Sequence, residues 1–205
     1  MDADAVEIRV LGCLIEKQRT TPDAYPLSLN ALRLACSQTT NRDPVVDYDE
    51  RTIKAALDRM SGRGWTRLAS GASSRALKYR HLLDEALGLS GEEISLLAVM
   101  MLRGPQTLGE LKQRTERLQG FGSSEEVVET LDALARRELV VRLARRPGQK
   151  EERWIQLLGG ETTGDPDEVA RRTDDGVDRI AALEERLARL EAAFDELAGK
   201  LAGRE

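Results

Sequence analysis

The sequence predicts a mainly α-helical chain with small β-hairpins, in which one structural unit occurs twice and a further helix follows. Three observations predict this fold class. Apolar residues recur at helical spacing, one pattern returns 74 residues further along the chain, and heptads fill the C-terminal region. The 205 residues are 40% hydrophobic and 33% charged, as expected for globular domains. We therefore expect two small domains and a helical tail.

The repeat is clearest around the third helix of each unit. Six positions in the first unit have similar residues 74 positions later: Ile53, Leu57, Asp58, Met60, Arg63 and Trp65 align with Val127, Leu131, Asp132, Leu134, Arg137 and Leu139. Apolar helices are expected upstream, at 6–16 and 92–102. Short amphipathic helices should follow them, at 27–37 and 107–115. We assign residues 1–84 to the first domain and 85–158 to the second.

The third helix of each unit is predicted to precede a β-hairpin. In the first unit Asp49 can cap this helix, and Gly62 and Gly64 mark its end. Strands are expected at 65–68 and 77–80, with a turn at 71–74. In the second unit Ser123 or Ser124 is the expected cap of a helix at 127–137, and strands at 139–144 and 153–157 flank a turn at 146–148. Three helices followed by a hairpin is the winged-helix order, in which the third helix can enter a DNA major groove.

Three ordered motifs resemble those of a known family. They are LGCLIEK at 11–17, TPDAYPLSLNAL at 21–32 and NRDPV at 41–45. Together they closely resemble the YceH-like family, a bacterial group of uncharacterised proteins, over most of residues 1–160. The resemblance implies tandem winged-helix domains and no established activity. Turn formation accounts for the third motif, and the functional alternative makes Arg42 a phosphate or peptide contact.

Charge is distributed unevenly along the chain and indicates where an anionic partner could bind. The net charge is +3 in residues 1–83, −2 in 84–160 and −6 in 161–205. Residues 61–83 contain basic residues and no acidic ones, so they could contact DNA phosphates. The candidate DNA contacts of the first domain are Arg51, Lys54, Arg59 and Arg63 on the third helix and Arg67, Arg75, Lys78 and Arg80 in the hairpin. A solvated basic surface is the alternative interpretation.

The second unit is a weaker candidate for reading DNA. The outward face of its third helix carries Glu125, Glu129 and Asp132, which phosphates would repel. Its hairpin could add auxiliary contacts to the DNA backbone through Arg142, Arg145, Arg146 and Lys150. We therefore expect this domain to be auxiliary or to bind a protein partner.

The C-terminal region is expected to mediate self-association. Residues 159–176 have the composition of a flexible acidic linker, and residues 177–202 show a coiled-coil heptad. The apolar seam is formed by Ile180, Leu183, Leu187, Leu190, Phe194, Leu197 and Leu201. A parallel pair would place Arg179 opposite Glu184 and Arg186 opposite Glu191, so a parallel homodimer is predicted. Packing of this helix onto its own chain is the alternative.

Other function classes lack support in the sequence. The chain has one histidine, His81, and two cysteines, Cys13 and Cys36, too few for a metal site and best interpreted as reduced core residues. Common catalytic and phosphate-binding motifs are absent, so we expect neither an enzyme nor a cofactor. Without a signal peptide or a membrane span, a cytoplasmic location is expected.

The leading hypothesis is a non-enzymatic double-stranded DNA-binding protein acting as a dimeric transcriptional regulator. A tandem winged-helix scaffold that binds protein is the alternative.

Overall fold

Local capping signals mark where the third helix of each half begins. The computed structural model describes residues 3–69, 77–145 and 149–159. The side chain of Asp49 accepts the backbone N–H of Thr52 at the start of α3 (Glu50–Gly62). Ser123, rather than Ser124, caps α7 (Ser124–Arg136) in the same way. The helix caps are thus properties of a few adjacent residues and were predictable without the tertiary structure.

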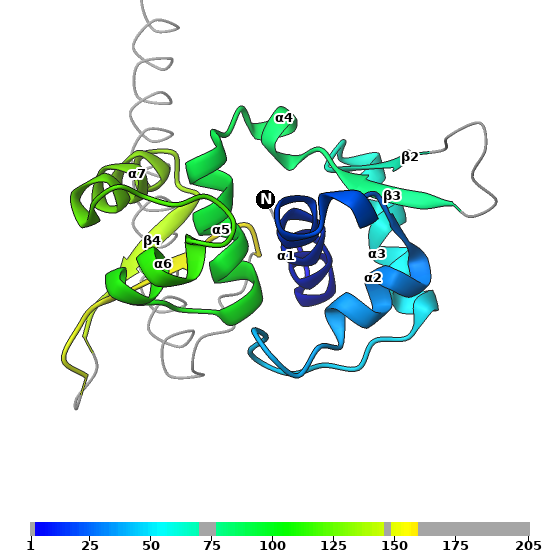
Figure 1. Cartoon of the computed structure of the whole chain (residues 1–205), viewed down its shortest axis with the longest axis horizontal. Coiled ribbons are helices and arrows are strands. Elements are labelled where there is room, and N and C mark those ends of the chain that lie inside the picture. Colours follow the sequence, from blue (N-terminus) through cyan, green and yellow to red (C-terminus); the bar gives the residue numbers. More distant parts are fainter. Residues whose placement is uncertain (1–2, 70–76, 146–148, 160–205) are drawn as a thin grey trace, which may run out of the picture. The chain divides into compact units, whose positions relative to one another are not determined.

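The element order confirms a mainly helical chain with small antiparallel sheets (Figure 1). The first half contains α1 (Ala5–Thr20), a 3₁₀ helix (Pro22–Ala24), β1 (Leu27–Ser28), α2 (Leu29–Cys36), α3, β2 (Thr66–Ala69) and β3 (Lys78–His81). The second half contains α4 (Leu83–Leu87), α5 (Gly91–Arg103), α6 (Leu108–Thr115), α7, β4 (Val140–Leu143) and β5 (Arg153–Gln156). The predicted boundary at 84/85 falls inside α4.

The internal repeat extends to the backbone bonds that follow each third helix. Trp65 N–H donates to the carbonyl of Met60 at 2.9 Å, and 74 residues later Leu139 N–H donates to that of Leu134 at 3.0 Å. The left-handed turn between helix and strand is made by Gly64 in the first half, with φ of 73°. In the second half Glu138 adopts it, with φ of 56°, a conformation that side chains other than glycine adopt at some cost.

Each hairpin gains a third chain segment from upstream. In the first half the sheet order is β1-β3-β2, all antiparallel. Residues 27–28 therefore form a strand, not the start of a helix as expected, and Ser28 then caps α2. In the second half Gln106 forms the matching bridge to Trp154 of β5. This pairing joins segments that are distant in sequence, so the spacing of apolar residues along a helix could not predict it.

The two halves share one hydrophobic core and meet mainly along α1 and α5. These two helices lie side by side at the centre of Figure 1. All described residues belong to one compact unit, Met1–Thr163. At the helix contact an ideal Cβ on Gly12 would lie 2.9 Å from Leu102 Cγ and 3.0 Å from Met101 Cβ. Gly12 therefore permits the close approach of α1 to α5.

We expect Gly12→Ala to destabilise the chain relative to a matched glycine substitution. Gly109→Ala, in α6, adds the same methyl group where nothing lies within 4 Å. Alanine has the higher helix propensity, and Gly12 lies in the helix interior, so a loss of stability at Gly12 must come from the steric clash, for which overpacking costs about 1–3 kcal/mol. Urea unfolding followed by circular dichroism measures both. Equal stability of the two variants would show that the helix contact relaxes without cost.

Several sequence predictions concern residues outside the described ranges, among them the turns at 71–74 and 146–148. The linker at 159–176, apart from Gly159, and the coiled-coil seam at 177–202 lie there. Among the described helices, none combines the length and apolar character needed to cross a bilayer. Cys13 and Cys36 are both buried, and neither forms a disulfide.

Candidate nucleic-acid interface

Helix α3 buries the apolar face predicted for it and exposes a mixed charged face. Ile53, Ala56, Leu57 and Met60 are buried, and Arg51 in the first turn is exposed. One turn further, Lys54 Nζ lies 2.5 Å from Asp58 Oδ1, and this hydrogen bond raises the pKa of Lys54. Both side chains of this pair are largely exposed. Water or a phosphate could therefore replace Asp58 at little cost.

Two other predicted contacts on α3 are held by a buried carboxylate. Glu7 of α1 is 1% exposed, and its Oε1 accepts from Arg59 Nε at 2.9 Å and from Arg63 Nη2 at 2.6 Å. Arg59 also donates to Asp4, and the Arg63 guanidinium lies over the Trp65 ring, 4.9 Å from its centroid. Because a buried carboxylate needs its cations, the structure gives Arg59 and Arg63 a stabilising role inside the first half. They are thus poor candidates for DNA contact.

The hairpin of the first half separates apolar and basic side chains between its two faces. Thr66, Tyr79 and His81 are buried on the inner face. Arg67 pairs directly with Arg80 across the strands on the outer face. Lys78 shares that face because strand residues alternate. Arg80 Nη2 lies 2.5 Å from Glu85, whereas Arg67 and Lys78 form no ion pair within the described ranges. Arg75 lies outside those ranges.

The structure therefore leaves fewer candidate DNA-contacting cations in the first half than the sequence predicted. Of the described candidates in the first half, only Arg51, Arg67 and Lys78 have no carboxylate partner among the residues the structure describes. Sequence reasoning counted the basic residues of 61–83 as unopposed because Glu7 and Glu85 lie beyond that window. The third helix and the outer face of the hairpin keep three unpaired cations.

In the second half, α7 and its hairpin form an open groove with charges of both signs. Its lining includes Leu108, Val128, Asp132, Arg145, Lys150 and Trp154, and its volume is about 570 Å³. Arg142 lies 3.3 Å from Glu152 and over the Trp154 ring. Arg145 and Lys150 are exposed, and Arg146 lies outside the described residues. As predicted, the outward face of α7 is acidic, with Glu125 and Glu129 both exposed.

Arg42 of the third family motif is a structural residue. Its side chain is fully buried and forms a bidentate pair with Glu16 of the first motif, at 2.6 and 3.1 Å. Its remaining donors bind Gln38 Oε1 and the carbonyls of Ala35 and Asn41. Because every donor is occupied within the chain, this arginine fixes the loop before α3. The turn interpretation of this motif therefore fits the structure better than a phosphate contact.

Sequence reasoning missed a basic cluster between α5 and α6. Arg103, Arg114 and Arg117 line a cavity of about 300 Å³. Burial lowers the pKa of Arg103, and the charges of Arg114 and Arg42 lower it further. These residues lie on separate segments, and no spacing in the sequence would have grouped them. Glu16 lines the same cavity, and Arg114 Nη2 lies 3.3 Å from Glu110 Oε1, so carboxylates partly neutralise this cluster.

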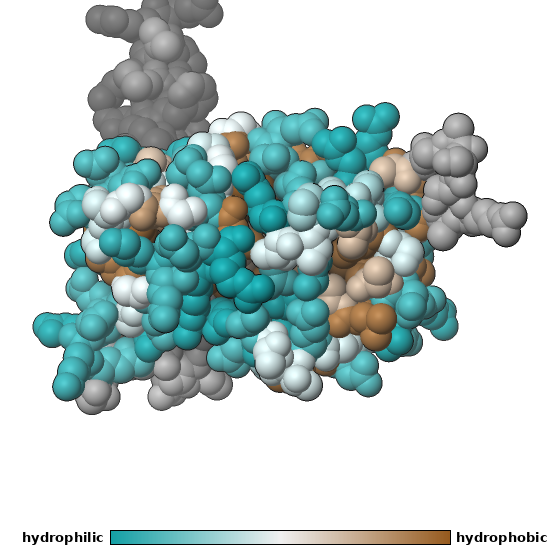
Figure 2. Space-filling model, viewed as in Figure 1, coloured by the Kyte–Doolittle hydropathy of each residue, from teal (hydrophilic) through white to brown (hydrophobic). Residues whose placement is uncertain are grey.

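The surface in Figure 2 is mostly hydrophilic, with apolar residues gathered over α2. Leu34 of α2 is 54% exposed. Within the described ranges, no group of three or more histidine, cysteine, aspartate or glutamate residues could hold a metal ion.

Comparison with known proteins identifies the family. The model for the family described as "Protein of unknown function, DUF480" matches residues 3–149. A UPF0502 protein of Solibacter usitatus is 46% identical over 196 residues, covering 94% of this chain and 95% of the relative. UPF0502 proteins of Shewanella amazonensis and Pelobacter propionicus are 46% and 48% identical, covering 95% and 90% of this chain and 96% and 88% of their own lengths. The chain therefore belongs to the bacterial DUF480 or UPF0502 family, the same family as the YceH-like proteins that its motifs resemble.

Proposed function

We propose that this protein is a non-enzymatic double-stranded DNA-binding protein built from tandem winged-helix domains and acting as a dimeric transcriptional regulator. The repeated order of three helices and a hairpin supports the winged-helix assignment. In that arrangement α3 enters the major groove, with Arg51 toward base edges, and the hairpin contacts the phosphate backbone. Dimerisation would come from the heptad at 177–202, and two first-half helices would then meet a two-fold site.

The observation that carries this proposal is the cross-strand pair Arg67 and Arg80. Like charges directly opposite in a sheet destabilise it, so folding alone does not favour this pair. Lys78 adds a third positive charge on the same outer face, and among the described residues only Glu85 pairs with any of the three. A phosphate backbone supplies the anions that would compensate this surface.

We expect the double variant Arg67→Ala/Lys78→Ala to weaken DNA binding equally for all sequences. Removing two phosphate contacts should lower the slope of log affinity against log salt concentration by about 2, since each contact contributes about 0.9. Fluorescence anisotropy with labelled 30-base-pair duplexes, drawn from genomic fragments, measures this slope between 50 and 200 mM salt. The substitutions should not lower fold stability, because they relieve repulsion.

The matched control is Lys112→Ala/Arg136→Ala, which removes two positive charges from α6 and α7 of the second half and none from either hairpin. We expect this control to bind like the unmodified chain. The proposal fails if the unmodified chain shows no salt-dependent duplex binding, or if the two double variants lose affinity equally.

The groove between α7 and the second hairpin favours a second candidate function, protein binding by the second half. Its lining includes Asp132, Arg145 and Lys150, and the exposed Val128 supplies an apolar contact. This mixture suits a protein surface better than a uniform phosphate backbone. Pull-down from lysate at physiological salt, with and without nuclease, tests it. Partners should survive nuclease treatment and be lost with Val128→Asp.

A further inference from the structure

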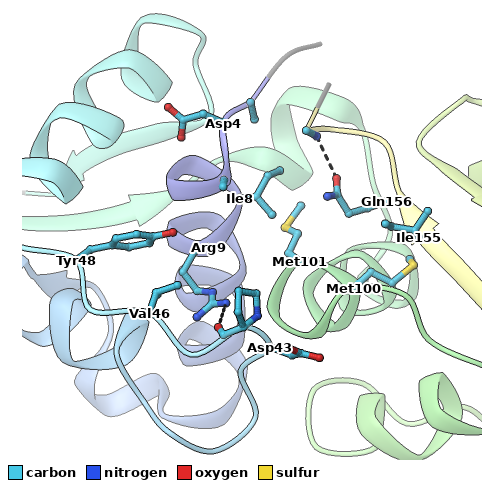
Figure 3. Close-up of a pocket in the computed structure, with 15 residues that line it drawn as sticks. Asp4, Ile8, Arg9, Asp43, Val46, Tyr48, Met100, Met101, Ile155 and Gln156 are labelled. Atoms are coloured by element: carbon cyan, nitrogen blue, oxygen red, sulfur yellow. Dashed lines mark hydrogen bonds between the residues drawn. The ribbon is translucent and has the colours of Figure 1, made fainter. Parts of the chain in front are cut away.

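A cavity of about 590 Å³ lies between the two halves of the unit (Figure 3). Its walls come from α1 and the residues before it, from the loop 43–48, from α5 and from β5. The first half supplies Ile8, Arg9 and Tyr48, and the second supplies Met100, Met101 and Ile155. The cavity therefore exists only where both halves are packed together. Its volume is in the usual range for small-molecule sites.

Most of the cavity wall is apolar and buried. Ile8 is 7% exposed, and Met100, Met101 and Ile155 are each less than 5% exposed. Figure 3 shows these side chains and the Tyr48 ring around the same space. Methionine side chains adapt readily to irregular ligands. Such a wall favours the apolar body of a small molecule.

Arg9 is the buried charged residue on this wall, and its guanidinium has no counter-ion among the residues that the structure describes. The residue is 4% exposed, and it donates to the carbonyl oxygens of Cys36 at 3.2 Å and Pro44 at 2.6 Å. Its Nε has no hydrogen-bond partner, and no carboxylate among the described residues forms an ion pair with it. The other buried arginine, Arg42, has Glu16 at 2.6 Å. An uncompensated buried cation is costly, and none of the described carboxylates neutralises the charge that Arg9 places at this cavity.

We infer that this cavity binds a small monocarboxylate with an apolar body, its carboxylate paired with Arg9 and its apolar part against Met100 and Met101. One cation at the wall matches one negative charge on the ligand. Asp4 and Asp43 lie exposed at the rim and disfavour ligands with several negative charges. This site is separate from the proposed DNA-contacting surface, and neither assignment depends on the other.

Titration of the full chain with octanoate and its neutral analogue octanamide tests this inference. Carbon-13 labelling of the methionine methyl groups reports where each compound binds. The signals of Met100 and Met101 should shift, whereas that of Met60, buried in the first half outside the cavity, should not. Octanoate should bind at least tenfold more tightly than octanamide, because only octanoate can pair with the guanidinium.

Three variants separate the charge from the cavity space. Arg9→Met should bring the affinities of the two compounds within threefold, and Arg9→Lys should keep the preference for octanoate. Ala5→Trp, at an exposed position of the lining, should block both compounds without altering the core. The inference is overturned if neither compound shifts the Met100 and Met101 signals, if both bind the unmodified chain equally, or if Arg9→Met retains the preference.

Discussion

Glu16→Ala should lower the free energy of unfolding by about 3–5 kcal/mol, the usual cost of removing one partner from a buried ion pair. The Arg42 side chain is fully buried, and Glu16 Oε1 and Oε2 are its only carboxylate partners in the described structure. Without Glu16, the guanidinium keeps its bonds to the carbonyls of Ala35 and Asn41 and loses its counter-ion. The loop that joins α2 to α3 would then enclose an uncompensated charge.

Urea unfolding monitored by circular dichroism measures this loss, and two further variants define its cause. Glu85→Ala removes an ion pair whose partners are both well exposed, so its cost should stay below about 1 kcal/mol. The double change Glu16→Leu/Arg42→Met removes both charges and should recover most of the stability. If Glu16→Ala costs no more than Glu85→Ala, the pair does not stabilise the loop.

The second large effect is a loss of stability on acidification caused by His81. Burial lowers the pKa of His81 to about 4, although the nearby Asp84 carboxylate opposes this shift, and the charges of Arg80 and Arg19 add to it. The ring Nε2 lies 2.6 Å from Gln18 Oε1, and Nδ1 lies 3.5 Å from Asp84. The side chain is fully buried, so we assign it as neutral in the folded chain at pH 7 rather than ion-paired with Asp84.

The sign of the pH dependence follows from this lowered pKa. The unfolded chain binds a proton at His81 near pH 6.5, whereas the folded chain binds it only near pH 4. Between these values the unfolded state holds more protons, so acidification favours unfolding. The stability contributed by the neutral ring is fully present above pH 6.5. Acidification to pH 4 should therefore lower the free energy of unfolding by about 3 kcal/mol, because each unit of pKa difference corresponds to about 1.4 kcal/mol.

Comparison with His81→Gln isolates this contribution, because the chain contains no other histidine. Glutamine can still donate to Gln18, and it does not titrate. Thermal or urea unfolding from pH 7 to pH 4 should show a steeper loss for the unmodified chain than for the variant. Parallel stability curves would mean that the folded chain takes up the proton as readily as the unfolded one.

The family motifs acquire structural explanations once they are placed in the fold. Gly12 allows α1 to approach α5, and Glu16 binds Arg42 of the third motif. In the second motif, the Tyr25 hydroxyl accepts the backbone N–H of His81. These motifs therefore position the helices and the loop of the first half. They do not by themselves identify a binding surface.

Much of the helical framework was predictable because its signals are local. The third helices and their caps at Asp49 and Ser123 follow from spacing within a few residues. The hairpin strands follow from short alternating segments. The strand at 27–28 was missed because its partner, β3, lies about fifty residues away. The coiled-coil heptad lies outside the described residues and stays a prediction.

The pairing of the charged side chains was not predictable from the sequence, because their partners are distant along the chain. Arg59 and Arg63 look unopposed in the third helix, yet Glu7 of α1 binds both. Arg9 occupies an ordinary position in an apolar helix, and only the packing of α1 against the loop 43–48 and α5 places it beside a cavity. The sequence alone determined the longer helices, the caps of α3 and α7 and the repeat, but not α4 or the 3₁₀ helix, because hydrogen bonds and apolar periodicity act over a few residues. Three-dimensional packing decided which cations are neutralised and which remain available, because electrostatic pairing depends on distance in space and not along the chain.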